Sequence, residues 1–163
     1  MAENVVFSLA KKLVGRCVSK NVSLCTAESC TGGMIAESIT AVSGASAVFL
    51  GALVTYDERM MAKWLGVSEE TLSSFGAVSE ACAREMAEGA RRASGAALAL
   101  SVTGFAGPAG GTAKDPVGTV YLAVSSASGT VAYRQRFSGG RDAVRTAAVE
   151  EALRHLLSAA ESI

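Results

Sequence analysis

Apolar residues recur every three or four positions near the start of the chain, and this spacing predicts an amphipathic helix over residues 3–20. The apolar stripe of this helix consists of Val6, Leu9, Leu13 and Cys17. The lysines fall outside that stripe, as they do in a helix that covers a protein core. Residues 22–27 then form a short apolar run, which is typical of a buried strand.

Strands and helices are predicted to alternate along the rest of the chain. Further strands are predicted over residues 48–56, 96–103, 117–126 and 130–137, the last two forming a hairpin. Further helices are predicted from Met34, over residues 57–65, from Ser68, over residues 79–94, and from the loop 138–142 onward. This order predicts an α/β fold, a three-layer α/β/α sandwich around a mixed sheet, with a single domain over residues 1–163.

Composition excludes several classes of protein. Fifteen basic and fifteen acidic residues give no formal net charge, which argues against a broad basic face for nucleic acid. No apolar run approaches the roughly 18 residues of a membrane span, and the N-terminus with Glu3 is not typical of a signal peptide. The four cysteines lack the paired spacing of a metal site. We therefore expect a reduced, cytoplasmic protein that binds neither nucleic acid nor a membrane.

The loop after the first strand carries chemically active side chains. In Glu28-Ser29-Cys30-Thr31-Gly32-Gly33, a carboxylate, hydroxyls and a thiol stand at the entrance of the next helix. Unpaired N–H groups and the helix dipole favour an anion at such an entrance. The structural alternative is an ordinary helix cap, since Ser and Thr are common there.

Two further loops, 104–111 and 138–142, are rich in glycine. Glycine lets the backbone approach a phosphate or sugar closely. Loops 28–33 and 104–111 both follow strand ends, where open α/β sheets bind ligands. Neither loop matches the P-loop or the dinucleotide-binding pattern. Three such loops in one small domain favour a phosphorylated small ligand.

Five stretches of the sequence form a distinctive set. They are Ala27-Glu28-Ser29-Cys30-Thr31-Gly32-Gly33, Gly76-Ala77-Val78-Ser79-Glu80, Thr103-Gly104-Phe105-Ala106-Gly107-Pro108 with Gly111, Pro116-Val117-Gly118-Thr119-Val120, and Arg141-Asp142-Ala143-Val144-Arg145. Together they resemble the CinA C-terminal domain family, over about residues 5–157. The resemblance implies a nicotinamide-nucleotide amidohydrolase, which converts nicotinamide mononucleotide and water to nicotinate mononucleotide and ammonia in pyridine nucleotide salvage. Larger CinA proteins carry an extra N-terminal domain, for which we expect no room here.

The family resemblance also implies roles for individual residues. Family members use a serine, a lysine and a tyrosine without a metal or cofactor, and the resemblance assigns the serine to Ser29 and the tyrosine to Tyr56. The implied ligand-binding residues are Glu28, Thr31, Gly32, Gly33, Gly104, Gly107, Gly111 and Arg141. Two roles stay open, because Glu28 could instead cap the helix and Arg141 could meet a phosphate or a nearby carboxylate. The Gly- and Ala-rich helices would permit close packing in a homo-oligomer.

The family's lysine is missing from its expected position. In the family it lies five residues after the tyrosine, and the spacing from Tyr56 to Leu65-Gly66-Val67 is unchanged, yet the fifth residue is Met61. Methionine fills space but cannot exchange a proton. Lys63 lies about 200° away around a helix, so we expect it to face solvent. Two alternatives remain: a weakened amidohydrolase, or a nucleotide-binding relative without turnover.

Two other side chains are weaker candidates for chemistry. A thiol at a helix N-terminus can ionise, but the sequence places no histidine near Cys30. His155 shares the polar face of the last predicted helix with Glu151 and Ser158, which predicts a solvated surface histidine. The sequence shows no cationic neighbour of Tyr56.

Overall fold

The structure, a computed structural model, describes residues 4–163. The predicted start of the first helix at Glu3 and the expectation about a signal peptide there lie outside these residues. Five strands form one sheet in the order β2-β1-β3-β4-β5. The strands are β1 (Leu24–Glu28), β2 (Phe49–Val54), β3 (Leu98–Gly104), β4 (Thr119–Ser126) and β5 (Gly129–Arg136). β1 runs parallel to β2 and β3, whereas β4 runs antiparallel to β3 and β5, so the predicted mixed sheet is confirmed.

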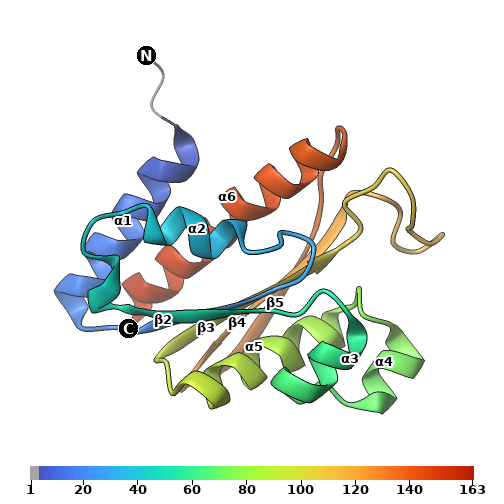
Figure 1. Ribbon diagram of the computed structural model, residues 1–163, viewed down its shortest axis with the longest axis horizontal. Coiled ribbons are helices and arrows are strands. Elements are labelled where there is room, and N and C mark those ends of the chain that lie inside the picture. Colours follow the sequence, from blue (N-terminus) through green and yellow to red (C-terminus); the bar gives the residue numbers. More distant parts are fainter. Residues whose placement is uncertain (1–3) are drawn as a thin grey trace.

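Helices cover both faces of this sheet (Figure 1). They are α1 (Val5–Lys20), α2 (Met34–Thr40), α3 (Glu58–Met60), α4 (Glu69–Phe75), α5 (Glu80–Ser94) and α6 (Arg141–Ser162), together with the short 3₁₀-helix η1 (Ala45–Ala47) and the π-helix η2 (Met61–Leu65). α1, α2 and α6 lie on one face, and α5 with α3 and α4 lies on the other (Figure 1). The predicted three-layer sandwich is therefore confirmed. Among residues 4–163, no helix is long and apolar enough to span a membrane.

Local sequence signals explain where the helices begin and end. The side chain of Ser68 accepts a hydrogen bond from the backbone N–H of Thr71 at 3.1 Å. Ser79 does the same for Cys82, also at 3.1 Å. Gly95 ends α5 with φ of 69°, a left-handed conformation that glycine adopts without steric cost. These caps stand at the positions that the sequence predicts.

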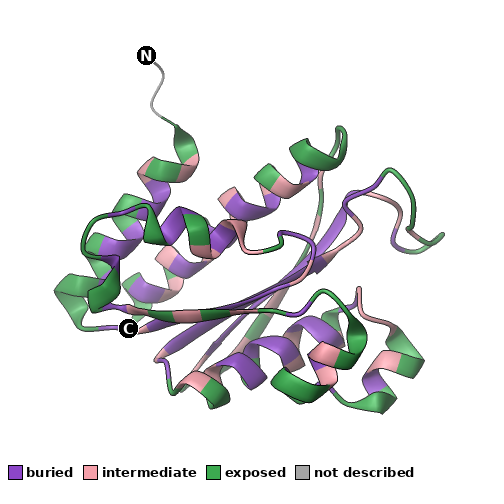
Figure 2. Cartoon of the chain, viewed as in Figure 1, coloured by how far each residue is buried: buried purple, intermediate pink, exposed green. Residues whose placement is uncertain are grey.

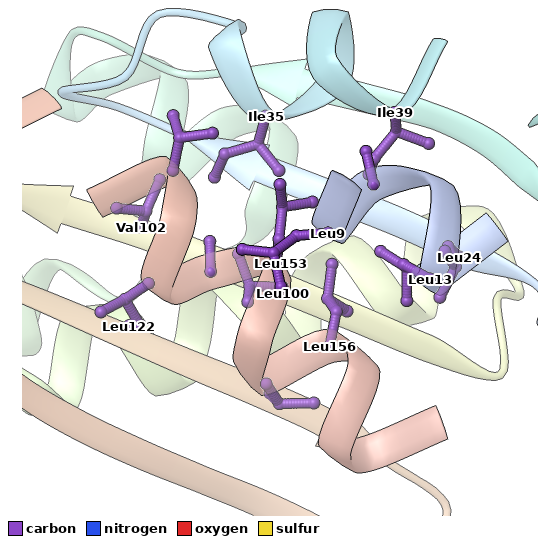
Figure 3. Packing of buried hydrophobic residues seen from close by; sticks show 14 of the residues in the cluster. Leu9, Leu13, Leu24, Ile35, Ile39, Leu100, Val102, Leu122, Leu153 and Leu156 are labelled. Carbon is purple, nitrogen blue, oxygen red and sulfur yellow. The ribbon is translucent and has the colours of Figure 1, made fainter. Parts of the chain in front are cut away.

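The larger hydrophobic core lies between the sheet and α1, α2 and α6. Its side chains come from both sides of that interface and include Leu9, Leu13, Leu24, Ile35, Ile39, Leu100, Val102, Leu122, Leu153 and Leu156 (Figure 3). Buried residues line the inner sides of the helices and the middle strands (Figure 2). On β3, Leu98, Leu100 and Val102 face this core, because side chains alternate along a strand.

A second cluster lies under α5, on the opposite face of the sheet. Its members include Cys25, Ala27, Met61, Leu65, Cys82, Met86 and Ala99. The π-helix η2 packs directly against α5, where a Cβ on Gly89 would lie only 1.8 Å from the Leu65 carbonyl oxygen. Arg92 also donates a hydrogen bond to that oxygen at 3.2 Å. These contacts fix η2, and with it Met61, against the sheet face that carries Ala27.

Candidate active site

Ser29 directly follows β1 at the carboxyl end of the sheet. Its N–H donates to the carbonyl oxygen of Val102 at 3.0 Å, so the pairing with β3 continues one residue past the strand. Ala27 packs in the cluster under α5, and the alternation of the strand therefore directs Ser29 to that same face. The Ser29 hydroxyl is half-buried and forms no side-chain hydrogen bond with another residue in the described part of the chain.

The carboxylate of Glu28 is completely buried and caps α2. One oxygen accepts from the Thr31 hydroxyl at 2.7 Å and from the N–H groups of Gly33 and Ile35 at 3.0 and 3.1 Å. The other oxygen accepts from the N–H of Ala36 at 2.8 Å. A negative charge at this end of a helix is favourable because it opposes the dipole. The negative charge at the entrance of α2 is thus the Glu28 carboxylate. Glu28 caps the helix, which is one of the two roles that the sequence left open for it.

Arg145 holds loop 28–33 in place from the side of α6. Its Nε donates to the carbonyl oxygen of Cys30 at 3.1 Å, and its Nη2 donates to that of Thr31 at 3.2 Å. A Cβ on Gly32, in the left-handed region, would lie 3.6 Å from the same guanidinium. Sequence reasoning did not single out Arg145 as a site residue. Its position one helical turn after Arg141, on the same face of α6, was the available signal.

Arg141 joins two other parts of the predicted site. Its Nη1 donates to the carbonyl oxygen of Gly107 at 2.9 Å, and its Nη2 donates to the phenol oxygen of Tyr56 at 3.0 Å. The expectation that Tyr56 has no cationic neighbour is therefore wrong, because the partner lies 85 positions away in sequence. β2 ends before the predicted strand does, so Tyr56 lies in a loop with 64% of its surface exposed.

The glycines of loop 104–111 allow close packing against the segment that follows it. A Cβ on Gly107 would lie 2.7 Å from the Val117 side chain, and one on Gly111 would lie 2.7 Å from the Val117 nitrogen. A Cβ on Gly104 would lie 2.8 Å from Val120. The fold alone thus requires small residues here, and binding of a ligand by Gly104, Gly107 and Gly111 stays a prediction.

Met61 is buried among apolar side chains in the cluster under α5. It is 1% exposed, and its Sδ lies 3.8 Å from the Sγ of Cys82. Lys63 is exposed, so the two side chains point to different environments, as their spacing predicts. The helix between them is wound as a π-helix rather than as the expected α-helix. Because Ala27 belongs to the same cluster, Met61 lies on the face toward which Ser29 is directed.

The two weaker candidates for chemistry, Cys30 and His155, are both shielded from solvent. Cys30 is only 6% exposed, and burial raises the pKa of its thiol to about 12, so it stays protonated near neutral pH. The prediction of a solvated His155 is wrong: its side chain is 16% exposed and its ring stacks on Tyr133 with centroids 3.6 Å apart. β5 brings Tyr133 over the last helix, and burial lowers the pKa of His155.

A cleft of about 910 Å³ opens on the α5 side of the sheet. Its lining includes Ala77, whose carbonyl oxygen accepts a hydrogen bond from the Thr103 hydroxyl at 2.8 Å. Thr103 belongs to β3, and the lining also includes Glu58, two residues after Tyr56, and Phe105 of the glycine-rich loop. Ser29 and Tyr56 themselves are not among the lining residues. No group of His, Cys, Asp or Glu side chains within residues 4–163 is arranged to hold a metal ion.

Ser29, Tyr56 and the glycine-rich loop 104–111 all follow strands of the sheet. We compared the chain with known protein families and solved structures. The model of the CinA C-terminal domain matches residues 6–160. Nicotinamide-nucleotide amidohydrolase PncC of Escherichia coli is 43% identical over 157 residues, which are 96% of this chain and 95% of that protein. The chain therefore belongs to the CinA C-terminal domain family.

Other relatives differ in length. A CinA-like protein of an Anaeromyxobacter species is 50% identical over 145 residues, and the chain spans only 36% of that relative's length. Among solved structures, a competence/damage inducible protein from Agrobacterium tumefaciens superposes with a TM-score of 0.93 at 40% identity, covering 97% of both chains. The fold is thus shared with solved members of the same superfamily.

Proposed function

We propose that this chain binds nicotinamide mononucleotide and hydrolyses its carboxamide slowly, releasing ammonia and nicotinate mononucleotide. The name of the PncC relative, at 43% identity over nearly the full length of both chains, supports the substrate and the reaction. The position of Ser29 at a strand end, and of Tyr56 beside the arginine of α6, supports the placement of the reaction.

In the proposed reaction Ser29 Oγ attacks the carboxamide carbon. Because no basic side chain stands at position 61, water carries the hydroxyl proton to the leaving nitrogen. Ammonia then departs from an acyl-enzyme, which a second water hydrolyses. The phenol of Tyr56 donates a hydrogen bond to the oxyanion while its own oxygen accepts from Arg141. Glu28 and Arg145 hold the serine loop in place through its backbone and the entrance of α2.

Met61 is the observation that sets the expected rate. A thioether buried to 1% exposure beside Cys82 offers no proton acceptor at the position of the family's lysine. Loss of a positioned general base commonly lowers a rate by about 10²–10⁴. The proposal is therefore an enzyme whose binding site is kept and whose turnover is reduced. The same observation favours a second candidate, a nucleotide-binding relative with no turnover.

Ammonia release from nicotinamide mononucleotide tests the proposal, with titration calorimetry for binding. We expect binding by the wild type, slow release, and loss of release but not of binding in Ser29→Ala. Lys63→Ala is the control for a displaced base, and it should leave the slow rate unchanged because Lys63 is exposed.

Each alternative has a distinct outcome. Binding without any ammonia release supports the non-catalytic relative. Fast release that Lys63→Ala abolishes in a folded protein would identify Lys63 as the base and overturn the assignment at Met61. Absence of binding at millimolar nucleotide would reject the substrate.

A further inference from the structure

Many of the polar groups around loop 28–33, which carries the proposed nucleophile, are bound within the protein. The N–H groups at the entrance of α2 are taken by Glu28. Arg145 is committed to two carbonyl oxygens of that loop. Arg141 donates to Tyr56, where the carboxamide reacts in the proposed function, whereas the pyridine ring and the ribose separate the carboxamide from the phosphate. The length of the nucleotide therefore places its phosphate at some distance from Ser29 and Tyr56.

The 910 Å³ cleft offers such a place, and its volume is ample for a mononucleotide. Its charged lining residues are Glu58, Glu80, Arg84, Lys114, Asp115 and Arg134. Arg84 pairs with Glu80 at 2.9 Å. Arg134 pairs with Asp115, also at 2.9 Å. Lys114 forms no ion pair with any residue from 4 to 163, so it is the cation of this lining that is available to an anionic ligand.

Asp115 stands next to this lysine with a carboxylate only partly used. Its Oδ1 accepts from the Tyr121 hydroxyl and from the Arg134 Nε, both at 2.9 Å. Arg134 also donates to the carbonyl oxygen of Lys114 at 3.0 Å, which fixes the backbone between the two residues. The Asp115 Oδ2 accepts no hydrogen bond from the described residues, and Asp115 lines the cleft. A carboxylate oxygen in this setting is suited to the hydroxyl groups of a sugar.

We infer that Lys114 and Asp115 form a ribose-phosphate subsite, in which the Lys114 ammonium binds the phosphate and the Asp115 Oδ2 accepts from the ribose hydroxyls. The inference rests on the proposed function for the identity of the nucleotide. Phosphate and ribose are neighbours in that ligand, as the two residues are in the chain. Glu58, which also lines the cleft, lies two residues after Tyr56, so a nucleotide held there has its carboxamide end near the loop of Tyr56.

Calorimetric titration of three probes tests the subsite: nicotinamide mononucleotide, nicotinamide riboside, which lacks the phosphate, and ribose 5-phosphate. Lys114→Ala should weaken binding of both phosphorylated probes by about tenfold, because one charge-assisted contact is lost, and leave the riboside unchanged. Lys12→Ala, an exposed lysine on α1, is the matched control and should change none of the three.

Asp115→Asn is the second variant and should weaken all three probes, since each carries the ribose. Thermal unfolding checks that it stays folded without the full pairing to Arg134. Nucleotide binding that is insensitive to Lys114→Ala would overturn the subsite and leave the proposed function standing. If ribose 5-phosphate binds in a Lys114-dependent way but the nucleotide does not bind, the proposed function is rejected and the subsite stands. If no probe binds, the subsite and the proposed function are both rejected.

Discussion

Restoring a lysine at position 61 should raise the rate of ammonia release. Met61 is 1% exposed and lies among apolar side chains under α5. An amine there loses its hydration, which lowers a lysine pKa by up to about 3–5 units. A shift of about 3 units from the ordinary value of about 10.4 leaves about half of the amine neutral near pH 7.5, and that fraction can accept the Ser29 proton. We expect Met61→Lys to exceed the wild-type rate by at least about tenfold.

The same shift predicts a cost in stability that depends on pH. At about 1.4 kcal/mol per unit, a lowering by about 3 units destabilises the variant by about 4 kcal/mol at neutral pH, within the usual stability of a domain. Between the lowered and the ordinary pKa, the unfolded chain binds the proton that the folded chain has lost. The free energy of unfolding of Met61→Lys should therefore rise with pH from about 7 to about 10.

The assay compares ammonia release and urea unfolding for the wild type, Met61→Lys and Met61→Leu. Leucine keeps the volume and apolarity, so this control should cost less than about 1.5 kcal/mol and gain no activity. The rate of Met61→Lys should rise as pH passes the lysine pKa and the amine becomes a base. A folded lysine variant that binds the nucleotide with no gain in rate would refute the assignment of this position.

Three further predictions follow from local packing. Gly118→Ala should lower the free energy of unfolding, measured in urea, by more than about 3 kcal/mol, because φ is +94° and a Cβ would lie 2.1 Å from the Phe137 oxygen. Gly15→Ala is the control: Gly15 lies in α1 with free space around it, so this variant should raise the free energy of unfolding by about 0.5–1 kcal/mol. Glu28→Gln should lower stability by about 2 kcal/mol, since the charged cap of α2 is lost, and an unchanged unfolding midpoint would contradict that role. Cys30, whose pKa burial raises to about 12, should react with a thiol reagent at pH 8 only on unfolding, and fast reaction of the native protein would contradict its burial.

Patterns of near neighbours predicted most of the secondary structure. The apolar periodicity of residues 3–20 and the caps at Ser79 and Gly95 specify α1 and α5, because a helix depends on contacts three and four residues apart. The spacing along the chain also predicted that Met61 and Lys63 face different environments, which the structure confirms, whereas the catalytic role of Ser29 stays a prediction. The sequence predicted a strand that extends to residue 56, but the edge strand β2 ends at Val54, so Tyr56 lies in a loop.

Tertiary packing decided which side chains meet. Arg141 reaches Tyr56 across 85 positions, and Arg145 reaches Cys30 across 115, because α6 lies beside the carboxyl ends of β1 and β2. His155 belongs to a polar helix face in the sequence, yet β5 covers it with Tyr133. Periodicity records which face of an element is apolar, but the identity of its partner depends on how the elements pack, and that is settled only when the sheet and its two helical layers are assembled.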